Sequence, residues 1–281
     1  MPLAHSQEEN PAAQIKTIFP TFTTIDVPGA GVTGVQGVNT AGDMVGVYAP
    51  MNTGPAHAFL LKNGAFTYFD YAGAYSTLAY GINDSGLIVG FAYFNGGTTA
   101  QGFKYNGTKF SLFNEGANSA TFGMGVNNSG FIVGGAGSIY ETTGFELRSG
   151  SYKSIAPPGN YVYIYATAVN NLGEVVGWTD SGGFTYRGGK VQTIAVPGAI
   201  VTEAHGVNDS GLIAGWYGKC SVNDCGFVLM KGQILSFAYP GATGTFPAGI
   251  NASGEVVGSY TFDYQTYHGF VTSPITAEDL Q

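Results

Sequence analysis

The ten residues "GINDSGLIVG" at 81–90 return almost unchanged as "GVNDSGLIAG" at 206–215, and this repetition determines the expected fold. The pattern G-[IV]-N-x-x-G-x-[IV]-[VA]-G occurs six times, with one departure in the first copy (Met44) and one in the fourth (Ala168). Successive copies are 44, 44, 43, 38 and 43 residues apart, which indicates a repeat architecture. The Asn of each copy is called the motif Asn below: Asn39, Asn83, Asn127, Asn170, Asn208 and Asn251.

Each copy continues with a second anchor, a Phe after a small residue: Phe59, Phe103, Phe145, Phe184, Phe227 and Phe270. The copies divide into four short segments, which in the second copy are "TLAYGIN", "GLIVGFAY", "GFKYNG" and "KFSLFN". β-branched and aromatic residues between Gly and Asn turns favour strands, and the second segment is apolar at consecutive positions, which indicates burial on both faces. Four such strands per copy predict a propeller blade.

The two ends of the chain supply the missing strand. The sixth copy stops after its third strand, "HGFVTSPIT", whereas "FTTIDVPGA" (22–30) has the character of a fourth strand but precedes the first copy. We therefore expect an all-β, six-bladed β-propeller with four antiparallel strands per blade, in which the N-terminal strand completes the last blade and leaves no open edge. The predicted propeller spans residues 21–274, between an N-terminal tail (1–20) and a C-terminal tail (275–281).

The composition excludes several kinds of partner. The net charge is −8, and only ten Lys and Arg residues are available for phosphate contacts, so we expect no nucleic-acid binding. No window approaches the roughly 18 consecutive apolar residues of a membrane span, so no membrane insertion is expected. Nothing in the sequence indicates a cofactor, and we expect a monomer.

Two features bear on localisation. Ala4, His5 and Ser6 have the small-x-small pattern of a signal-peptidase site, without the basic and apolar parts of a signal. Residues 1–6 are therefore either the remnant of a signal peptide or a tail without a targeting role. In an exported protein, Cys220 and Cys225 are expected to form a small loop disulfide, and two unpaired thiols are the alternative.

The repeated "NDSG" lies between the first two strands of a copy, where a tight turn requires Asn, Asp or Gly. The Asn side chain can also accept hydrogen bonds from nearby backbone amides. A calcium loop is excluded, because "NTAG" (39–42) and "NNLG" (170–173) lack the necessary carboxylates. We interpret the segment as a structural turn.

The repeated motif followed by "HAF" (57–59) or "HGF" (268–270) resembles the HAF family of extracellular repeat proteins, over about residues 22–273. The resemblance implies export, to the cell exterior or the periplasm, and a propeller-like fold, but no particular chemistry. The His of the triplet is present only at His57 and His268; the other copies have Gln101, Thr143, Gly182 and Cys225.

Residues that differ between copies are the candidates for function, and they gather near the start of the first strand of each copy. Side chains three and five residues before the motif Asn point to the same side of this strand, toward the central mouth of the face that carries the variable loops. The predicted ligand-binding residues are Gln36, Tyr80, Phe122, Met124, Tyr165, Thr167, Glu203, His205 and Phe246. The alternative is that the aromatic members fill the space between blades. Trp178 and Trp216, at matched positions in two copies, are interpreted as packing residues.

Glu203 and His205 form an acid–imidazole pair that can act as a general base, with Tyr165 as a candidate acid or orienting group. No second carboxylate stands at glycosidase spacing, no G-x-S-x-G elbow is present, and no cluster indicates a metal site. The leading prediction is a secreted propeller that binds a glycan or another small extracellular ligand at the mouth, since flat aromatic faces beside polar groups suit sugar rings. The first alternative is a hydrolase, lyase or cyclising enzyme that uses Glu203 and His205; the second is a structural or surface-assembly module.

Overall fold

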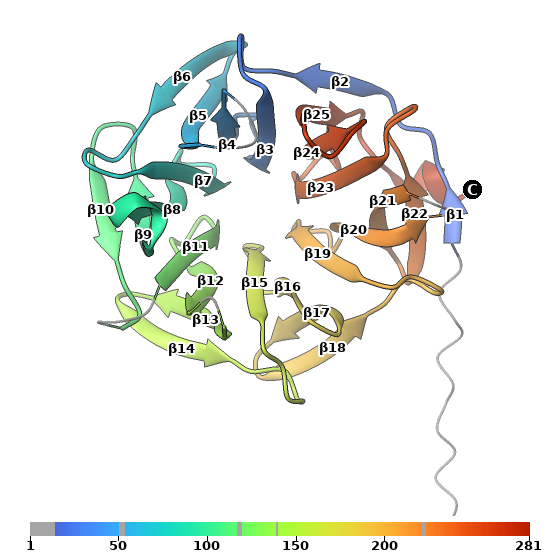
Figure 1. The fold of residues 1–281 in the computed structure, drawn as a ribbon. Helices are drawn as coiled ribbons and strands as arrows, with labels where there is room; N and C mark the ends of the chain where they lie inside the picture. The colour runs from blue at the N-terminus through green and yellow to red at the C-terminus, as the bar shows by residue number, and fades with distance from the viewer. Residues whose placement is uncertain (1–14, 51–53, 117–119, 139, 221–222) are drawn as a thin grey trace, which may run out of the picture.

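The computed structural model describes residues 15–50, 54–116, 120–138, 140–220 and 223–281. The chain forms a closed ring of β-sheets around a central axis (Figure 1). Each of the first four copies forms one antiparallel four-stranded sheet. Their strands are β3 (Val32–Val38), β4 (Met44–Ala49), β5 (His57–Lys62) and β6 (Ala65–Phe69); β7 (Ser76–Ile82), β8 (Ile88–Phe94), β9 (Thr99–Tyr105) and β10 (Phe110–Phe113); β11 (Ala120–Val126), β12 (Ile132–Gly137), β13 (Thr142–Arg148) and β14 (Ser151–Ile155); and β15 (Ile164–Val169), β16 (Val175–Thr179), β17 (Gly182–Arg187) and β18 (Lys190–Ile194).

The fifth and sixth copies share one nine-stranded mixed sheet. It contains β19 (Thr202–Val207), β20 (Ile213–Cys220), β21 (Asn223–Met230), β22 (Gln233–Phe237), β23 (Gly244–Ile250), β24 (Val256–Thr261), β25 (His268–Thr272), β1 (Ile15–Thr17) and β2 (Phe22–Ile25). The all-β class and the propeller fold are confirmed, but the prediction of six four-stranded blades is wrong: the structure has four such blades and this mixed sheet.

The reason for the merger lies in the hairpin β20–β21, whose strands have eight residues each. The start of β21 extends beyond its pairing with β22, and Asp224 pairs in parallel with Gly244 of β23. The Asp224 amide donates a hydrogen bond to the Thr243 carbonyl (3.2 Å). The repeat pattern does not predict this contact, because Asp224 and Gly244 lie outside the repeated motif.

The chain ends meet in this sheet. β2 pairs antiparallel with β25, from Phe22↔Thr272 to Ile25↔Gly269, as expected of the N-terminal strand. Residues 15–17, inside the predicted N-terminal tail, form β1, which pairs in parallel with β22 and covers its edge. In the predicted C-terminal tail, the 3-10 turn η2 (Ala277–Leu280) follows the buried Ile275. A second 3-10 turn, η1 (Asn95–Gly97), lies between β8 and β9. The candidate signal-peptide residues 1–6 lie outside the described part of the chain.

The last Gly of the motif and the Phe anchor form one structural unit. Gly90 is the cross-strand partner of Phe103, and the ring of Phe103 lies over the glycine. A Cβ at Gly90 would come within 2.0 Å of the Leu78 carbonyl oxygen and 2.8 Å of the Phe103 ring. The same pairing recurs in every copy, and all six Phe side chains are buried: Gly46–Phe59, Gly90–Phe103, Gly134–Phe145, Gly177–Phe184, Gly215–Phe227 and Gly258–Phe270.

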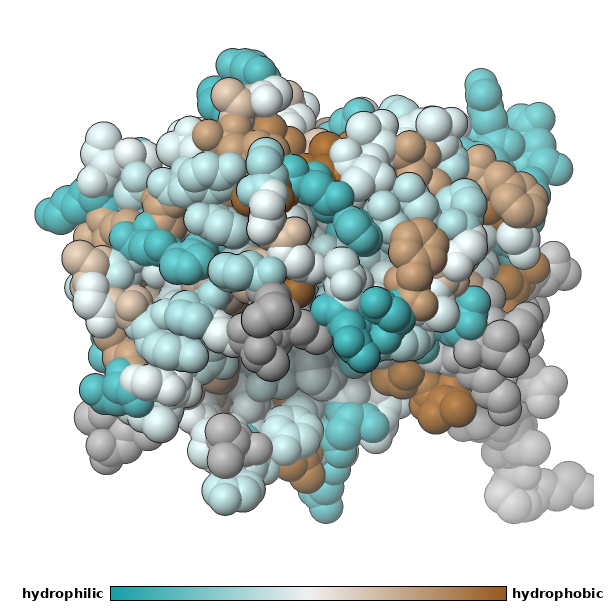
Figure 2. Space-filling model, turned by 45° about the horizontal axis from the view of Figure 1, so that its top comes forward, coloured by the Kyte–Doolittle hydropathy of each residue, from teal (hydrophilic) through white to brown (hydrophobic). Residues whose placement is uncertain are grey.

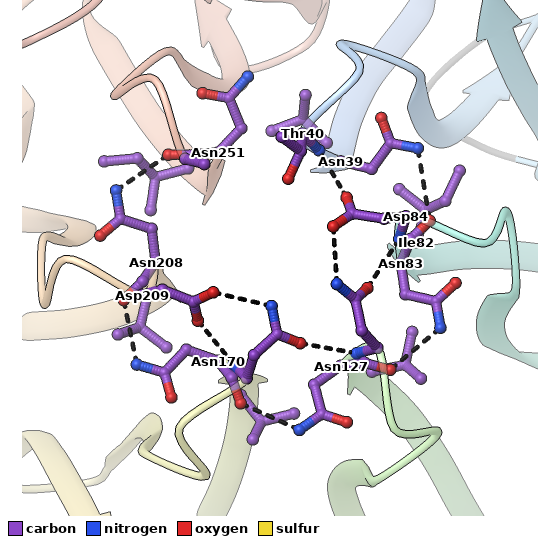
Figure 3. Close-up of a pocket in the computed structure, with 18 residues that line it drawn as sticks. Asn39, Thr40, Ile82, Asn83, Asp84, Asn127, Asn170, Asn208, Asp209 and Asn251 are labelled. Carbon is purple, nitrogen blue, oxygen red and sulfur yellow. Dashed lines mark hydrogen bonds between the residues drawn. The ribbon is translucent and has the colours of Figure 1, made fainter.

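The motif Asn fastens its own turn and the next copy at once. In copy three, the Asn127 side-chain oxygen accepts hydrogen bonds from the amides of Ser129 (3.0 Å) and Phe131 (3.1 Å). Its Nδ2 donates to the Asn170 carbonyl of the next copy (3.0 Å). Five motif Asn residues donate in this way around the axis, as Figure 3 shows: Asn39, Asn83, Asn127, Asn170 and Asn208. The turn interpretation therefore explains the hydrogen bonds of the Asn side-chain oxygen. The ring of hydrogen bonds between copies explains the role of the side-chain Nδ2.

The Asn ring has a seam at the sixth copy. Asn251 donates to Glu255 Oε2 in its own turn (2.6 Å) instead of reaching the first copy. A neighbouring belt of hydrogen bonds joins Thr40 to Asp84 (Figure 3). The belt continues from Asp84 to Asn128. Burial alone would raise the pKa of Asp84, but the hydrogen bonds from Asn128 and the Thr40 amide outweigh it and lower that pKa.

The outer surface is mixed in character. Figure 2 shows small apolar patches separated by hydrophilic side chains on the side of the ring that is turned toward the viewer. None of the helices in the described part of the chain has the length and apolar character of a membrane span.

Tyr152 of β14 offers a test of the packing. Its hydroxyl is buried without a hydrogen-bond partner among the described residues, and burial raises its pKa to about 12. Because an unpaired buried polar group costs about 1–3 kcal/mol, we expect Tyr152→Phe to stabilise the fold by about 1 kcal/mol in urea unfolding. Tyr105→Phe is the control, since the exposed Tyr105 hydroxyl donates to the Gly107 carbonyl (2.8 Å) and gains nothing by removal. Destabilisation by Tyr152→Phe would contradict the description of the Tyr152 hydroxyl as buried and without a hydrogen-bond partner among the described residues.

Candidate ligand-binding site

The first strand of each copy lies nearest the central axis and is called the inner strand (Figure 1). It carries a β-bulge at the residue three positions before the motif Asn. In copy two, Ala79 and Gly81 have partners on β8, and Tyr80 between them is the extra residue. Bulges re-aim side chains, and here they turn six unlike side chains toward the axis. These bulge residues are Gln36, Tyr80, Met124, Thr167, His205 and Ala248.

All six bulge residues meet around one cavity of about 240 Å³, and Trp178 of β16 completes its wall. We call it the axial cavity. The structure thus brings together five of the nine predicted ligand-binding residues: Gln36, Tyr80, Met124, Thr167 and His205. The channel continues along the axis as a space of about 100 Å³. It ends in one of about 80 Å³ within the Asn ring (Figure 3).

The other four predicted residues do not line the axial cavity. Phe122 packs edge-on against Phe91 of the preceding copy, with ring centroids 4.9 Å apart. Phe246 packs against Trp216 of the preceding copy at 5.3 Å. These contacts match the alternative of packing between copies. Tyr165 and Glu203 instead contact side chains of the cavity wall: Tyr165 contacts Trp178, and Glu203 contacts His205.

Tyr165 lies against Trp178, with ring centroids 4.7 Å apart, and its hydroxyl shares a hydrogen bond with Thr142 Oγ1 (3.2 Å). Tyr165 therefore sets the position of Trp178. This hydroxyl makes no hydrogen bond to Glu203 or His205, and the proposed role as an acid in that pair has no geometric support.

Glu203 and His205 are in direct contact, as the shared side of the strand predicts. His205 Nε2 lies 3.0 Å from Glu203 Oε2, and both side chains are largely buried. Trp216 Nε1 lies 3.2 Å from the same His205 nitrogen. One nitrogen cannot donate to Glu203 and accept from Trp216 at once. His205 Nε2 therefore makes only one of these two hydrogen bonds at a time, depending on whether it carries a proton. His205 Nδ1 has no hydrogen bond to the described residues and is the nitrogen left for a ligand.

The polar groups of the cavity differ in their availability. Thr167 Oγ1 lies within hydrogen-bonding distance of the carbonyls of Val176 (3.1 Å) and Ala204 (2.8 Å), so its proton is used by the fold. The Tyr80 hydroxyl and the Gln36 side-chain amide make no hydrogen bond to the described residues, and both line the cavity. Burial, together with the neighbouring Tyr93 and Tyr165, raises the pKa of Tyr80 to about 12. Tyr80 therefore remains a neutral hydrogen-bonding group across the physiological pH range.

The raised pKa of Tyr80 predicts a specific loss of stability in alkali. A tyrosine with a pKa near 10 in the unfolded chain and about 12 in the fold contributes stability that is fully present below pH 10. This contribution is lost as the pH rises toward 12, and the loss reaches about 2 kcal/mol at pH 11.5. Urea unfolding at pH 9 and pH 11.5 should show a smaller loss in Tyr80→Phe than in the parent chain. Equal losses in the two proteins would contradict the environment described for Tyr80.

Sequence reasoning missed Trp178 and Trp216 as residues of the site. Trp178 and Trp216 are cross-strand partners of Tyr165 and Glu203, the residues five before the motif Asn. Strand pairing across the turn that contains the motif Asn places the residue eight after this Asn opposite the one five before it. Applying this rule to the sequence would have brought both Trp residues to the site.

Two further predictions concern cysteines and metals. Cys225 is disulfide-bonded, but the side chain of its predicted partner Cys220 lies outside the described part, so the pairing stays a prediction. Among the residues that the structure describes, no group of three or more His, Cys, Asp and Glu is placed to hold a metal ion.

The fold is similar to solved propeller proteins. A virginiamycin B lyase from Staphylococcus aureus, crystallised with quinupristin, aligns with a TM-score of 0.51 at 11% identity over 90% of this chain and 99% of that one. The SapL1 lectin in complex with alpha methyl fucoside aligns with a TM-score of 0.53 at 9% identity, over 88% and 97%. An Aleuria aurantia lectin variant in complex with Fucalpha1-6GlcNAc aligns with a TM-score of 0.50 at 12% identity, over 91% and 99%. No family model and no curated protein matches the chain. At these identities the likeness establishes the propeller fold and no activity.

Proposed function

We propose that this propeller binds a small saccharide outside the cell, in the axial cavity. One observation carries the proposal: the six bulge residues, equivalent in the repeat, are six different side chains, and all six line one cavity. The motif Asn, the Gly–Phe units and the bulged strands recur in all copies, so the scaffold imposes no such variety. A set of unlike side chains around one opening is what recognition of an asymmetric small molecule requires.

The chemistry of the wall favours a sugar ring. Trp178 and Met124 supply apolar surface for C–H groups, whereas Tyr80, Gln36 and His205 supply hydrogen-bonding groups for hydroxyls. The volume of about 240 Å³ lies below the roughly 300–1,000 Å³ of pockets for drug-sized ligands, which favours a single sugar unit. The lectins among the similar structures agree with this ligand class.

The experiment is a glycan-array screen followed by calorimetric titration of the best glycoside with three variants. Ala248→Met fills the cavity, and the fold accommodates it because the equivalent position in copy three is Met124. Tyr80→Phe removes one free hydroxyl. Tyr105→Phe, outside the cavity, is the matched control. We expect Ala248→Met to abolish binding in the cavity, Tyr80→Phe to weaken it about 10-fold, and Tyr105→Phe to leave it unchanged. Unaltered binding by Ala248→Met would exclude the cavity.

The contact of His205 with Glu203 favours a second candidate, a lyase, hydrolase or cyclising enzyme at the same cavity. Glu203 can stabilise a protonated His205, and Trp216 can stabilise the neutral form, so the imidazole can exchange a proton with a ligand. The lyase of similar fold agrees with this possibility. Full turnover of any identified substrate by a Glu203→Gln, His205→Ala double variant would end the candidate.

A further inference from the structure

Two equivalent Tyr–His–Asp clusters lie on the rim of the ring, away from the axial cavity. In copy one, His57 is the cross-strand partner of Tyr48, and its Nδ1 lies 2.8 Å from Asp70 Oδ2. In copy six, His268 is the cross-strand partner of Tyr260, and its Nδ1 lies 2.9 Å from Asp26 Oδ2. Each imidazole also lies over the ring of its Tyr, with centroids 5.3 and 5.2 Å apart.

The fold does not need these clusters. The other four copies form the same strand pairs without His, as Ala92–Gln101, Ala136–Thr143, Thr179–Gly182 and Tyr217–Cys225. A contact that four copies omit is not required to hold strands together. The presence of the same three residue types in two copies therefore points to a role beyond stability.

The hydrogen bond to Asp fixes the orientation of each imidazole. A carboxylate accepts only, so Nδ1 donates to Asp and, in the neutral imidazole, Nε2 presents its lone pair. Neither Nε2 has a hydrogen-bond partner among the described residues. The side chains of His57 and His268 are 35% and 31% exposed, and those of Asp70 and Asp26 are 47% and 42% exposed. Each cluster thus offers solvent an imidazole acceptor and a carboxylate acceptor side by side.

An exposed aromatic ring accompanies each cluster. Phe262, 51% exposed, lies 5.6 Å from the Tyr260 ring and 6.5 Å from the His268 ring. Tyr68, 49% exposed, lies 5.1 Å from the Tyr48 ring. Each of these aromatic side chains is about half exposed. It provides a flat apolar face next to the hydrogen-bond acceptors of the His–Asp pair.

The two clusters occupy neighbouring sectors of the ring. β25 and β5 lie on either side of the point where the chain closes (Figure 1), and the Thr33 amide donates to the Tyr267 carbonyl across it (2.8 Å). Asp26 itself belongs to the segment that leads from β2 into β3. The two clusters therefore hold equivalent strand positions in two copies that adjoin in the ring.

We propose that these clusters are two saccharide subsites, which bind adjacent hydroxyls through His Nε2 and the Asp carboxylate while the sugar's C–H face lies on the exposed ring. A metal fits less well, because each cluster contains one imidazole and one carboxylate, and no group of three ligands occurs in the described residues. The subsites are separate from the axial cavity, and the two proposals stand or fall independently.

The test is an NMR titration of the full chain with methyl glycosides of fucose, galactose, mannose and N-acetylglucosamine. The chain has four His residues, so each imidazole signal is assigned by a single substitution. His57→Gln and Asp70→Asn are mild changes, because copy two has Gln101 and Asn114 at these positions. His268→Gln and Asp26→Asn make the same changes in copy six.

We expect one of the glycosides to shift the His57 and His268 signals together, and each single His→Gln variant to retain the response of the other cluster. The His57→Gln, His268→Gln double variant should lose rim affinity at least about 10-fold, with an unchanged melting temperature. In Ala248→Met the rim signals should still respond, whatever happens in the axial cavity. Imidazole signals that do not move with any glycoside, or that move with zinc chloride alone, would overturn the proposal.

Discussion

Gly90→Ala should destabilise the protein by at least about 3 kcal/mol. An added Cβ would meet the Leu78 carbonyl oxygen at 2.0 Å and the Phe103 ring at 2.8 Å, with Ala79 Cα at 3.0 Å behind them. The carbonyl belongs to the paired inner strand and cannot move without breaking that pairing, and the buried Phe103 ring has no free space around it. Overpacking against backbone is among the few mechanisms that produce so large an effect from one methyl group.

Urea unfolding of Gly90→Ala and Gly34→Ala measures this difference. Gly34 also lies in an inner strand, but a Cβ there meets the mobile end of the Gln36 side chain at 3.1 Å. The equivalent positions of other copies have Leu78 and Phe122, so a side chain is tolerated. We expect Gly34→Ala to stay within about 1 kcal/mol of the parent. Equal stabilities of the two variants would refute the Gly–Phe unit as the reason for the repeated glycine.

Asn127→Ala should cost about 3–5 kcal/mol. The substitution removes the acceptor for the Ser129 and Phe131 amides and the donor to the Asn170 carbonyl. Asn127 is 6% exposed, so water cannot replace these partners, and each unpaired buried group costs about 1–3 kcal/mol. The loss falls on the junction between copies three and four as well as on the turn.

Asn106→Ala is the matched control for Asn127→Ala. The Asn106 side-chain oxygen accepts hydrogen bonds from Thr108 and Lys109 amides in the same manner, but the residue is exposed and donates to no other copy. We expect a cost of about 1 kcal/mol or less in equilibrium unfolding. A similar cost for both variants would mean that the inter-copy hydrogen bonds add nothing to stability.

The fold could be predicted wherever side chains dictate it. The repeated Asn, Gly and Phe define turns, inner strands and the buried Phe layer, and "FTTIDVPGA" correctly indicates the strand that pairs with β25. The merger of the fifth and sixth copies depends on backbone groups of Asp224 and Gly244, and the β1 pairing on three residues in a stretch without a strand pattern. Such contacts leave no signature in side-chain periodicity.

The site was half predictable for a similar reason. Alternation along a strand correctly gathers the residues three before the motif Asn, such as Tyr80 and His205. Alternation contains no information on bulges, and it therefore gave equal weight to Phe122 and Phe246, which pack between copies. Trp178 became visible as part of the wall only when strand pairing set it opposite Tyr165.

A crystal structure with the best-binding methyl glycoside decides whether the axial cavity is the binding site. We expect a sugar ring in the axial cavity, with its C–H face against Trp178 and a hydroxyl bonded to Tyr80. Occupancy at the rim clusters in the same crystal would be compatible with this result. A crystal of the saturated complex in which the axial cavity holds only solvent, with the glycoside bound elsewhere, would contradict it.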